Sequence, residues 1–259
     1  DSGQVQITGT TTISAAGSNI TLDDDAADTD TYGTLVLTGA NVIVVEDAAS
    51  DLGLTSISGT LSLTSTGAVT DSAQVQVAGT TTISAAGNNI TLDDDAADTD
   101  TYGTLVLTGV TVTVVEDAAM DLGTIGATTL TLTAAGTITQ SGAATVSGNS
   151  TFTAGNTDDV LLTNGGSDYT GTVAFVASVG SLANVTIDDN SALDLQALAI
   201  TGNLDVTAGG AVTDSGQLQV TGTTTISAAG SNITLDDDAA DTDTYGTLVL
   251  TGVTVTVVE

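Results

Sequence analysis

The chain contains no lysine, arginine, histidine, cysteine or proline among its 259 residues. It carries 32 acidic residues, so its formal net charge is -32 at pH 7. DNA, RNA and anionic membrane surfaces would repel such a chain, because proteins bind these ligands through lysine and arginine. The missing histidine and cysteine also exclude imidazole or thiolate metal ligands, disulfides, and serine or cysteine nucleophiles activated by histidine.

Aromatic side chains are scarce as well, with four Tyr, two Phe and no Trp. Hydrophobic residues nevertheless make up 41% of the chain, which argues against disorder. Because aromatic residues usually supply much of the volume of a compact core, small aliphatic residues predict a narrow core of constant cross-section. The sequence has no apolar run of about 20 residues, as a transmembrane helix needs.

The sequence repeats itself. The segment that opens at Asp1 returns almost unchanged at Asp71 and again at Asp214, and a divergent copy begins at Gln140. We interpret the chain as one continuous domain, 1–259, with repeat units 1–70, 71–139, 140–213 and a truncated 214–259. The last unit stops in mid-repeat, so we expect the sequence to be an excerpt of a longer chain.

The local pattern is that of short β-strands. Segments such as TLTLT (129–133) and VTVTVV (110–115) alternate with period two, and Gly follows many of them. Recurrence about every 20 residues predicts an all-β parallel solenoid, with about three coils and one insertion in each unit. The inward columns should include Val5, Ile7, Ile13, Ile20, Leu35, Leu37, Ile43 and Leu52. A string of immunoglobulin-like sandwiches is the rival fold, but its domains run to about 100 residues and often bury a Trp.

Two segments carry a family resemblance. LTLTAAGTITQSGAATVSGNSTFTAGNTDDVLLTN (130–164) and AITGNLDVTAGGAVTDSGQLQVTGTTTISA (199–228) resemble the repeat regions of filamentous-haemagglutinin-like adhesins, exoproteins of bacterial two-partner secretion systems. The resemblance implies a right-handed parallel β-helix that is exported and displayed at the cell surface. It brings no catalytic signature with it.

Each well-conserved copy of the unit contains one dense acidic insertion. The candidate calcium ligands are Asp23, Asp24, Asp25, Asp28, Asp30, Asp93, Asp94, Asp95, Asp98, Asp100, Asp236, Asp237, Asp238, Asp241 and Asp243. Such carboxylates repel one another and no protein cation offsets them, so a hard cation that takes six to eight oxygens is the natural ligand. We expect these acids to lie outside the coils, which would leave the solenoid itself nearly neutral.

A solvated loop that binds no metal is the alternative. The stretch from Asp28 to Gly33 only partly matches a calcium loop, because Tyr32 stands where a third oxygen ligand should be. In the third unit the loop keeps its tyrosine, Tyr169, but loses most of its acids. We therefore expect the tyrosine to have a structural role in the coil, whereas the acids are not needed for the coil to form.

These observations favour a structural function. We expect the shaft of a secreted cell-surface adhesin or extracellular fibre, whose partners are further coils of a longer chain, head-to-tail copies of itself, or a host or cell-surface receptor. A calcium-binding matrix or biofilm module is the alternative. Threonine rows that bind ice are a weaker option, and enzyme activity is not expected because the carboxylate clusters recur in every well-conserved copy. Beyond calcium, no cofactor is expected.

Overall fold

A computed structural model describes residues 3–22, 29–92, 98–228, 230–235 and 242–258. It confirms an all-β parallel β-solenoid of about 12 coils, each about 20 residues long. The chain divides into two compact units, Asp1–Met120 and Asp121–Glu259. In the described residues no helix has the length and apolarity needed to cross a membrane.

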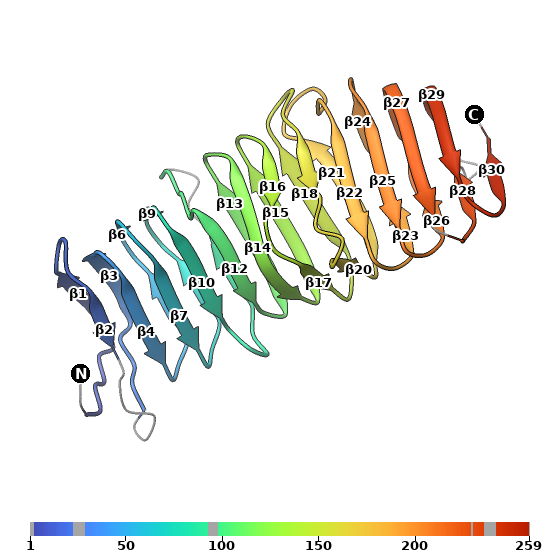
Figure 1. The fold of residues 1–259 in the computed structure, drawn as a ribbon. Coiled ribbons are helices and arrows are strands. Elements are labelled where there is room, and N and C mark those ends of the chain that lie inside the picture. The colour runs from blue at the N-terminus through green and yellow to red at the C-terminus, as the bar shows by residue number, and fades with distance from the viewer. Residues whose placement is uncertain (1–2, 23–28, 93–97, 229, 236–241, 259) are drawn as a thin grey trace. The chain divides into compact units, whose positions relative to one another are not determined.

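The first unit has two sheets, and its described strand pairs are parallel (Figure 1). One sheet has the order β13-β11-β8-β5-β3-β6-β9, with β1 also beside β3, and the other has the order β2-β4-β7-β10-β12. The strands are β1 Thr10–Ser14, β2 Ile20–Leu22, β3 Thr34–Gly39, β4 Val42–Glu46, β5 Ser50–Leu52, β6 Thr55–Ile57, β7 Leu61–Ser65, β8 Val69–Asp71, β9 Val75–Val77, β10 Thr80–Ser84, β11 Ile90–Leu92, β12 Thr104–Thr108 and β13 Thr111–Glu116.

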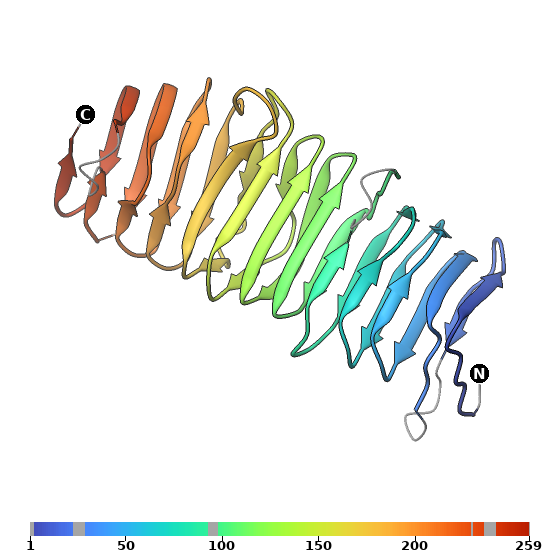
Figure 2. The same cartoon turned by 180° about the vertical axis from the view of Figure 1, so that it is seen from behind.

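The second unit repeats this arrangement, as the reverse view also shows (Figure 2). Its sheets have the orders β30-β28-β26-β23-β21-β18-β15 and β14-β16-β19-β22-β25-β27-β24, with β17 between β14 and β20 and with β29 beside β27. The strands are β14 Met120–Ala127, β15 Thr129–Ala134, β16 Ile138–Gln140, β17 Ala144–Val146, β18 Ser150–Ala154, β19 Val160–Leu162, β20 Asp168–Tyr169, β21 Thr172–Ala177, β22 Val185–Asp189, β23 Leu193–Leu195, β24 Leu198–Ile200, β25 Leu204–Ala208, β26 Val212–Asp214, β27 Leu218–Ala228, β28 Ile233–Leu235, β29 Thr244–Thr251 and β30 Val255–Val257.

Among the predicted core residues, Ile20, Leu35, Leu37 and Leu52 are buried and Val5, Ile7 and Ile13 are half-buried, whereas Ile43 is wrong. Ile43 was expected to point inward, but it is 47% exposed, whereas Val42 and Val44 are buried. The run Val42–Val45 is apolar on both faces of the strand, so its pattern does not settle which face is inward. The register settles it, because Val42 lies beside the buried Ile20 of the preceding coil and residues paired in adjacent parallel strands share a face.

Equivalent residues of successive repeats lie in opposite sheets. The identical Ile-Thr-Leu strands β2 and β11 belong to different sheets of the first unit, and so do the identical strands β1 and β10. A repeat of about 70 residues is therefore about three and a half coils of about 20 residues, instead of the three expected. The strands that precede the acidic insertions, β2 and β11, therefore belong to opposite sheets.

The core is built mainly from aliphatic columns, as predicted. Leu63, Ile83 and Leu107 lie side by side in β7, β10 and β12, and each is at most 1% exposed. In the second unit Phe152 stacks on Phe175 with ring centroids 5.7 Å apart, and Tyr169 meets the edge of Phe152 at 5.9 Å. In-register stacking thus lets identical side chains fill the same position in successive coils.

Two isoleucine variants test this inward register. Ile83→Asp should lower the free energy of unfolding by about 4 kcal/mol or more, because it buries a charge without a partner. Ile43→Asp makes the same chemical change at an exposed strand position and should change it by only about 0.5 kcal/mol. Urea denaturation followed by circular dichroism measures both. Equal losses for the two variants would contradict the register.

Candidate functional site

Most of the predicted calcium ligands lie outside the described residues. These are Asp23, Asp24, Asp25, Asp28, Asp93, Asp94, Asp95, Asp236, Asp237, Asp238 and Asp241. Asp30, Asp98, Asp100 and Asp243 are described, and the described part of the chain brings no three carboxylates into an arrangement that could hold a metal ion. Calcium binding by the insertions therefore stays a prediction.

Three of the described acids are buried inside the coil. Asp30, Asp100 and Asp243 are at most 2% exposed, which differs from the expectation that the acids lie outside the coils. Each carboxylate accepts a hydrogen bond from a backbone N–H about one coil earlier in the chain. The pairs are Val5 N to Asp30 Oδ1 at 2.6 Å, Val75 N to Asp100 Oδ1 at 2.5 Å, and Leu218 N to Asp243 Oδ1 at 2.6 Å. These carboxylates hold adjacent coils together.

In the first unit, four side chains form a buried cluster that we call the carboxyl corner: Asp71, Asp100, Tyr102 and Glu116. None of them is more than 2% exposed. The Tyr102 hydroxyl donates to Asp71 Oδ2 at 3.0 Å, and the Tyr102 backbone N–H donates to Glu116 Oε1 at 3.2 Å. Hydrogen bonding with the side chains of Asp71 and Tyr102 lowers the pKa of Asp100, against the larger effect of burial, which raises it. Three acidic side chains thus surround one tyrosine.

The backbone fixes the place of this corner. Thr101 joins the ladder of β9, donating to Val75 O at 3.0 Å and accepting from Val77 N at 2.8 Å. Gly103 follows the tyrosine with a φ of +62°, and a Cβ there would collide with the carbonyl oxygen of Gly79 in the preceding coil. Only glycine combines that backbone conformation with so close an approach, which explains the Tyr-Gly pair in the sequence.

Burial without cations raises the pKa values of acids in the corner. The pKa of Glu116 rises from 4.5 to about 7, chiefly because burial disfavours the charged form, although the Tyr102 N–H partly opposes the shift. Burial also raises the pKa of Asp100, with Asp98 adding like-charge repulsion. In the preceding coils, burial raises the pKa of Glu46, which accepts the Tyr32 backbone N–H at 3.0 Å.

A buried tyrosine–aspartate bond recurs in the other copies of the repeat, where the second aspartate of the copy, in place of the first, accepts the hydroxyl. The Tyr32 hydroxyl donates to Asp30 Oδ2 at 2.9 Å, and the Tyr245 hydroxyl donates to Asp243 Oδ2 at 3.0 Å. Asp214 occupies the place of Asp71 and is likewise buried, beside Leu195 of the adjacent strand. The corner is therefore a property of the repeat.

The divergent copy in the second unit carries a less acidic form of the corner. Gln140 replaces the first aspartate, Ser167 replaces the second, and Asp189 replaces the glutamate. Gln140 Nε2 donates to Ser167 Oγ at 2.8 Å and to the Tyr169 hydroxyl at 3.2 Å. The Ala144 N–H donates to Ser167 Oγ at 3.2 Å, as Val75 does to Asp100. Burial raises the pKa of both Tyr169 and Asp189. The retained tyrosine thus serves the coil, as the sequence indicated.

A row of amide side chains forms a second ladder that sequence reasoning missed. Asn41 Nδ2 donates to Asn19 Oδ1 at 3.0 Å, and Asn41 Oδ1 accepts from Thr60 N at 3.0 Å. In the second unit, Asn184 donates to Asp159 and accepts from Asn203 in the same way. Asn or Asp recurs just before the strands in the sequence, which could have indicated this ladder. The same residues are also common in turns, so the pattern does not distinguish a ladder from turns.

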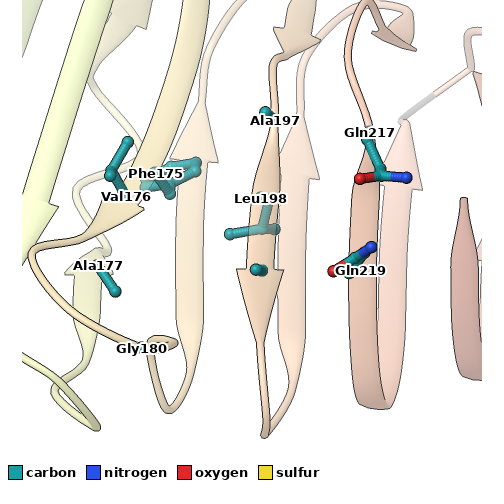
Figure 3. A pocket seen from close by; sticks show the side chains of 9 residues that line it. Phe175, Val176, Ala177, Gly180, Ala197, Leu198, Gln217 and Gln219 are labelled. Carbon is teal, nitrogen blue, oxygen red and sulfur yellow. The ribbon is translucent and has the colours of Figure 1, made fainter. Parts of the chain in front are cut away.

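The second unit also has an open surface groove of about 240 Å³ (Figure 3). Its lining includes Phe175, Val176, Leu198, Gln217 and Gln219. Gln217 Nε2 donates a hydrogen bond to Thr242 O at 2.8 Å. No carboxylate lines it, so the groove offers no acid or base group for catalysis.

The geometry defines a β-solenoid repeat protein whose coils are joined by buried side-chain hydrogen bonds. The family model of repeats of unknown function (DUF5649) matches residues 1–37, 39–108, 109–176 and 182–255, which is nearly the whole chain. The chain therefore belongs to the DUF5649 repeat family. Its segments recur about every 70 residues, as the self-comparison did, but with a different starting point. No curated protein and no solved structure matches the chain.

Removing single hydroxyls tests the role of the corner. Tyr102→Phe should lower the free energy of unfolding by about 1.5–3 kcal/mol at pH 8, because it takes a donor from a buried aspartate. Tyr169→Phe should lower it by only about 0.5–1.5 kcal/mol, because Gln140 keeps its bond to Ser167. Urea denaturation of both variants measures the difference. A smaller loss for Tyr102→Phe than for Tyr169→Phe would contradict the assigned partners.

Proposed function

We propose that this chain is a stiff structural segment of a secreted cell-surface adhesin or extracellular fibre. The observation that carries the proposal is the parallel pairing of the described strands within each unit, which stacks buried residues such as Leu63, Ile83 and Leu107 in register. Because each coil is held by its neighbours on both sides, such a stack resists bending and can be lengthened by adding repeats.

The distribution of chemical groups supports a scaffold over an enzyme. The buried acids recur in successive copies and bond to the coil itself, whereas an active site normally occurs once. The groove of the second unit lacks acid and base groups. A net charge of -32 would keep a long fibre soluble and would oppose contact with nucleic acid or anionic membranes.

The proposed partners follow from the same architecture. A solenoid coil presents unpaired backbone groups to whatever lies next along the stack, so the partner of this segment is a further coil of the same chain or a head-to-tail copy. A host or cell-surface receptor would bind elsewhere on the full assembly. The extracellular or cell-surface location belongs to this proposal.

Electron micrographs of the purified chain and of a tandem duplicate test the proposal. We expect elongated particles whose width is the same in both and whose length doubles in the duplicate, since each added coil extends the stack by about 4.8 Å. Particles that grow equally in all directions would contradict the structural function.

Calcium bridging is the second candidate function. It is favoured by the density of carboxylates in the repeated insertion, with no lysine or arginine in the chain to offset them. Thermal melting with calcium should show a higher Tm than melting with excess chelator, because a ligand specific to the folded state stabilises it. Magnesium at the same ionic strength is the control. A Tm that calcium leaves unchanged relative to magnesium would rule out an ordered calcium site.

A further inference from the structure

The sequence contains a single Asn-Gly pair, Asn164-Gly165, and this pair lies in the turn between β19 and β20. The Ser167 N–H closes the turn by donating to Asn164 O at 2.9 Å. Gly165 is exposed, and a Cβ built on it would meet no atom within 4 Å. The backbone nitrogen that follows Asn164 therefore belongs to an exposed residue with no side chain to obstruct it.

The turn also activates the side-chain amide of Asn164. The Gly166 N–H donates to Asn164 Oδ1 at 3.0 Å. Such a donor stabilises the negative charge that gathers on a carbonyl oxygen when a nucleophile attacks its carbon. The Gly165 N–H, by contrast, has no acceptor among the residues that the structure describes. An activated amide carbon and an unengaged backbone nitrogen are thus adjacent in the chain.

Elsewhere in the described chain, pairing between coils engages the N–H that follows an asparagine. The Thr157 N–H, next after Asn156, donates to Ser181 O at 3.0 Å. Along the row of amide side chains, the N–H groups that follow asparagines and donate to a carbonyl of the next coil are those of Ile20, Val42, Val185 and Ile233. A nitrogen held in such a bond cannot turn toward the side chain before it. The turn at Asn164 lacks this protection.

We propose that Asn164 is a self-modifying site, which the folded chain converts to isoaspartate and aspartate without an enzyme. The Gly165 nitrogen attacks Asn164 Cγ, so that an N–Cγ bond forms and the Cγ–Nδ2 bond breaks. Nδ2 leaves as ammonia and takes the proton that the Gly165 nitrogen loses. Water then opens the resulting succinimide at either of its carbonyls, which gives isoaspartate or aspartate and in both cases one new carboxylate.

The new charge arises beside the less acidic corner of the second unit. The Asn164 N–H donates to Gln140 Oε1 at 3.4 Å, and Gln140 Nε2 donates to Ser167 Oγ and to the Tyr169 hydroxyl. Asn164 also lies in the segment where the well-conserved copies carry their acidic insertion. The divergent copy therefore gains, as the protein ages, an acid that its sequence does not encode.

Ageing of the folded full chain at pH 8 tests the proposal. Anion-exchange chromatography should show a growing species that elutes with the Asn164→Asp reference. Mass spectrometry of peptic peptides should place the replacement of –NH2 by –OH at Asn164; pepsin is used because the chain has no lysine or arginine for trypsin. Gly165→Ala, whose added methyl has open space, should slow the conversion several-fold. A parent chain that gains no charge, or gains it at another asparagine, would overturn the proposal.

Ser191→Gly supplies a matched control, because it creates a second Asn-Gly pair at the exposed Asn190. There the N–H of residue 191 donates to Asp189 Oδ1 at 3.0 Å, so it is engaged as the Gly165 N–H is not. In the folded variant Asn190 should convert much more slowly than Asn164, whereas in concentrated urea the two should convert at similar rates. Equal rates in the folded variant would overturn the role of the unengaged N–H.

Discussion

The structure depends on satisfying buried acids without any basic side chain. Asp30, Asp100 and Asp243 each reach a backbone N–H of the preceding coil, and a neighbouring tyrosine adds a hydroxyl or an N–H at the same corner. A buried carboxylate that lost these donors would cost several kcal/mol, since nothing else in the chain can neutralise it. The acidic residues therefore do not all serve as surface charge. The buried ones bind the backbone of the preceding coil and so fix the position of one coil relative to the next.

The repeat does not span a whole number of coils, so identical sequences occupy different sheets. Because a unit of about 70 residues spans about three and a half coils, β2 and β11 place the same sequence in opposite sheets. Equivalent strands of successive copies in the first unit therefore meet different neighbours, although their sequences are identical.

Much of the fold could be predicted from the sequence, because period-two alternation and Gly spacing directly reflect strand geometry. Ile43 shows where that pattern fails, since Val42–Val45 is apolar on both faces and only the register with Ile20 selects the inward residue. The burial of Asp71 and Asp100 could not be predicted either. Their partners lie in adjacent coils, and a local reading of Asp-rich sequence indicates solvent. The replacement by Gln140 and Ser167 was the one visible signal, because it kept Tyr169 while removing charge.

Amide hydrogen exchange at the corner tests most directly the claim that buried side chains join the coils. The N–H of Tyr102 donates to a side chain, Glu116, and not to the strand ladder. At pH 6 the account predicts that it exchanges as slowly as the N–H groups within β13, and far more slowly than that of the exposed Thr99 three residues earlier. Exchange of the Tyr102 N–H at the rate of Thr99 would contradict the account.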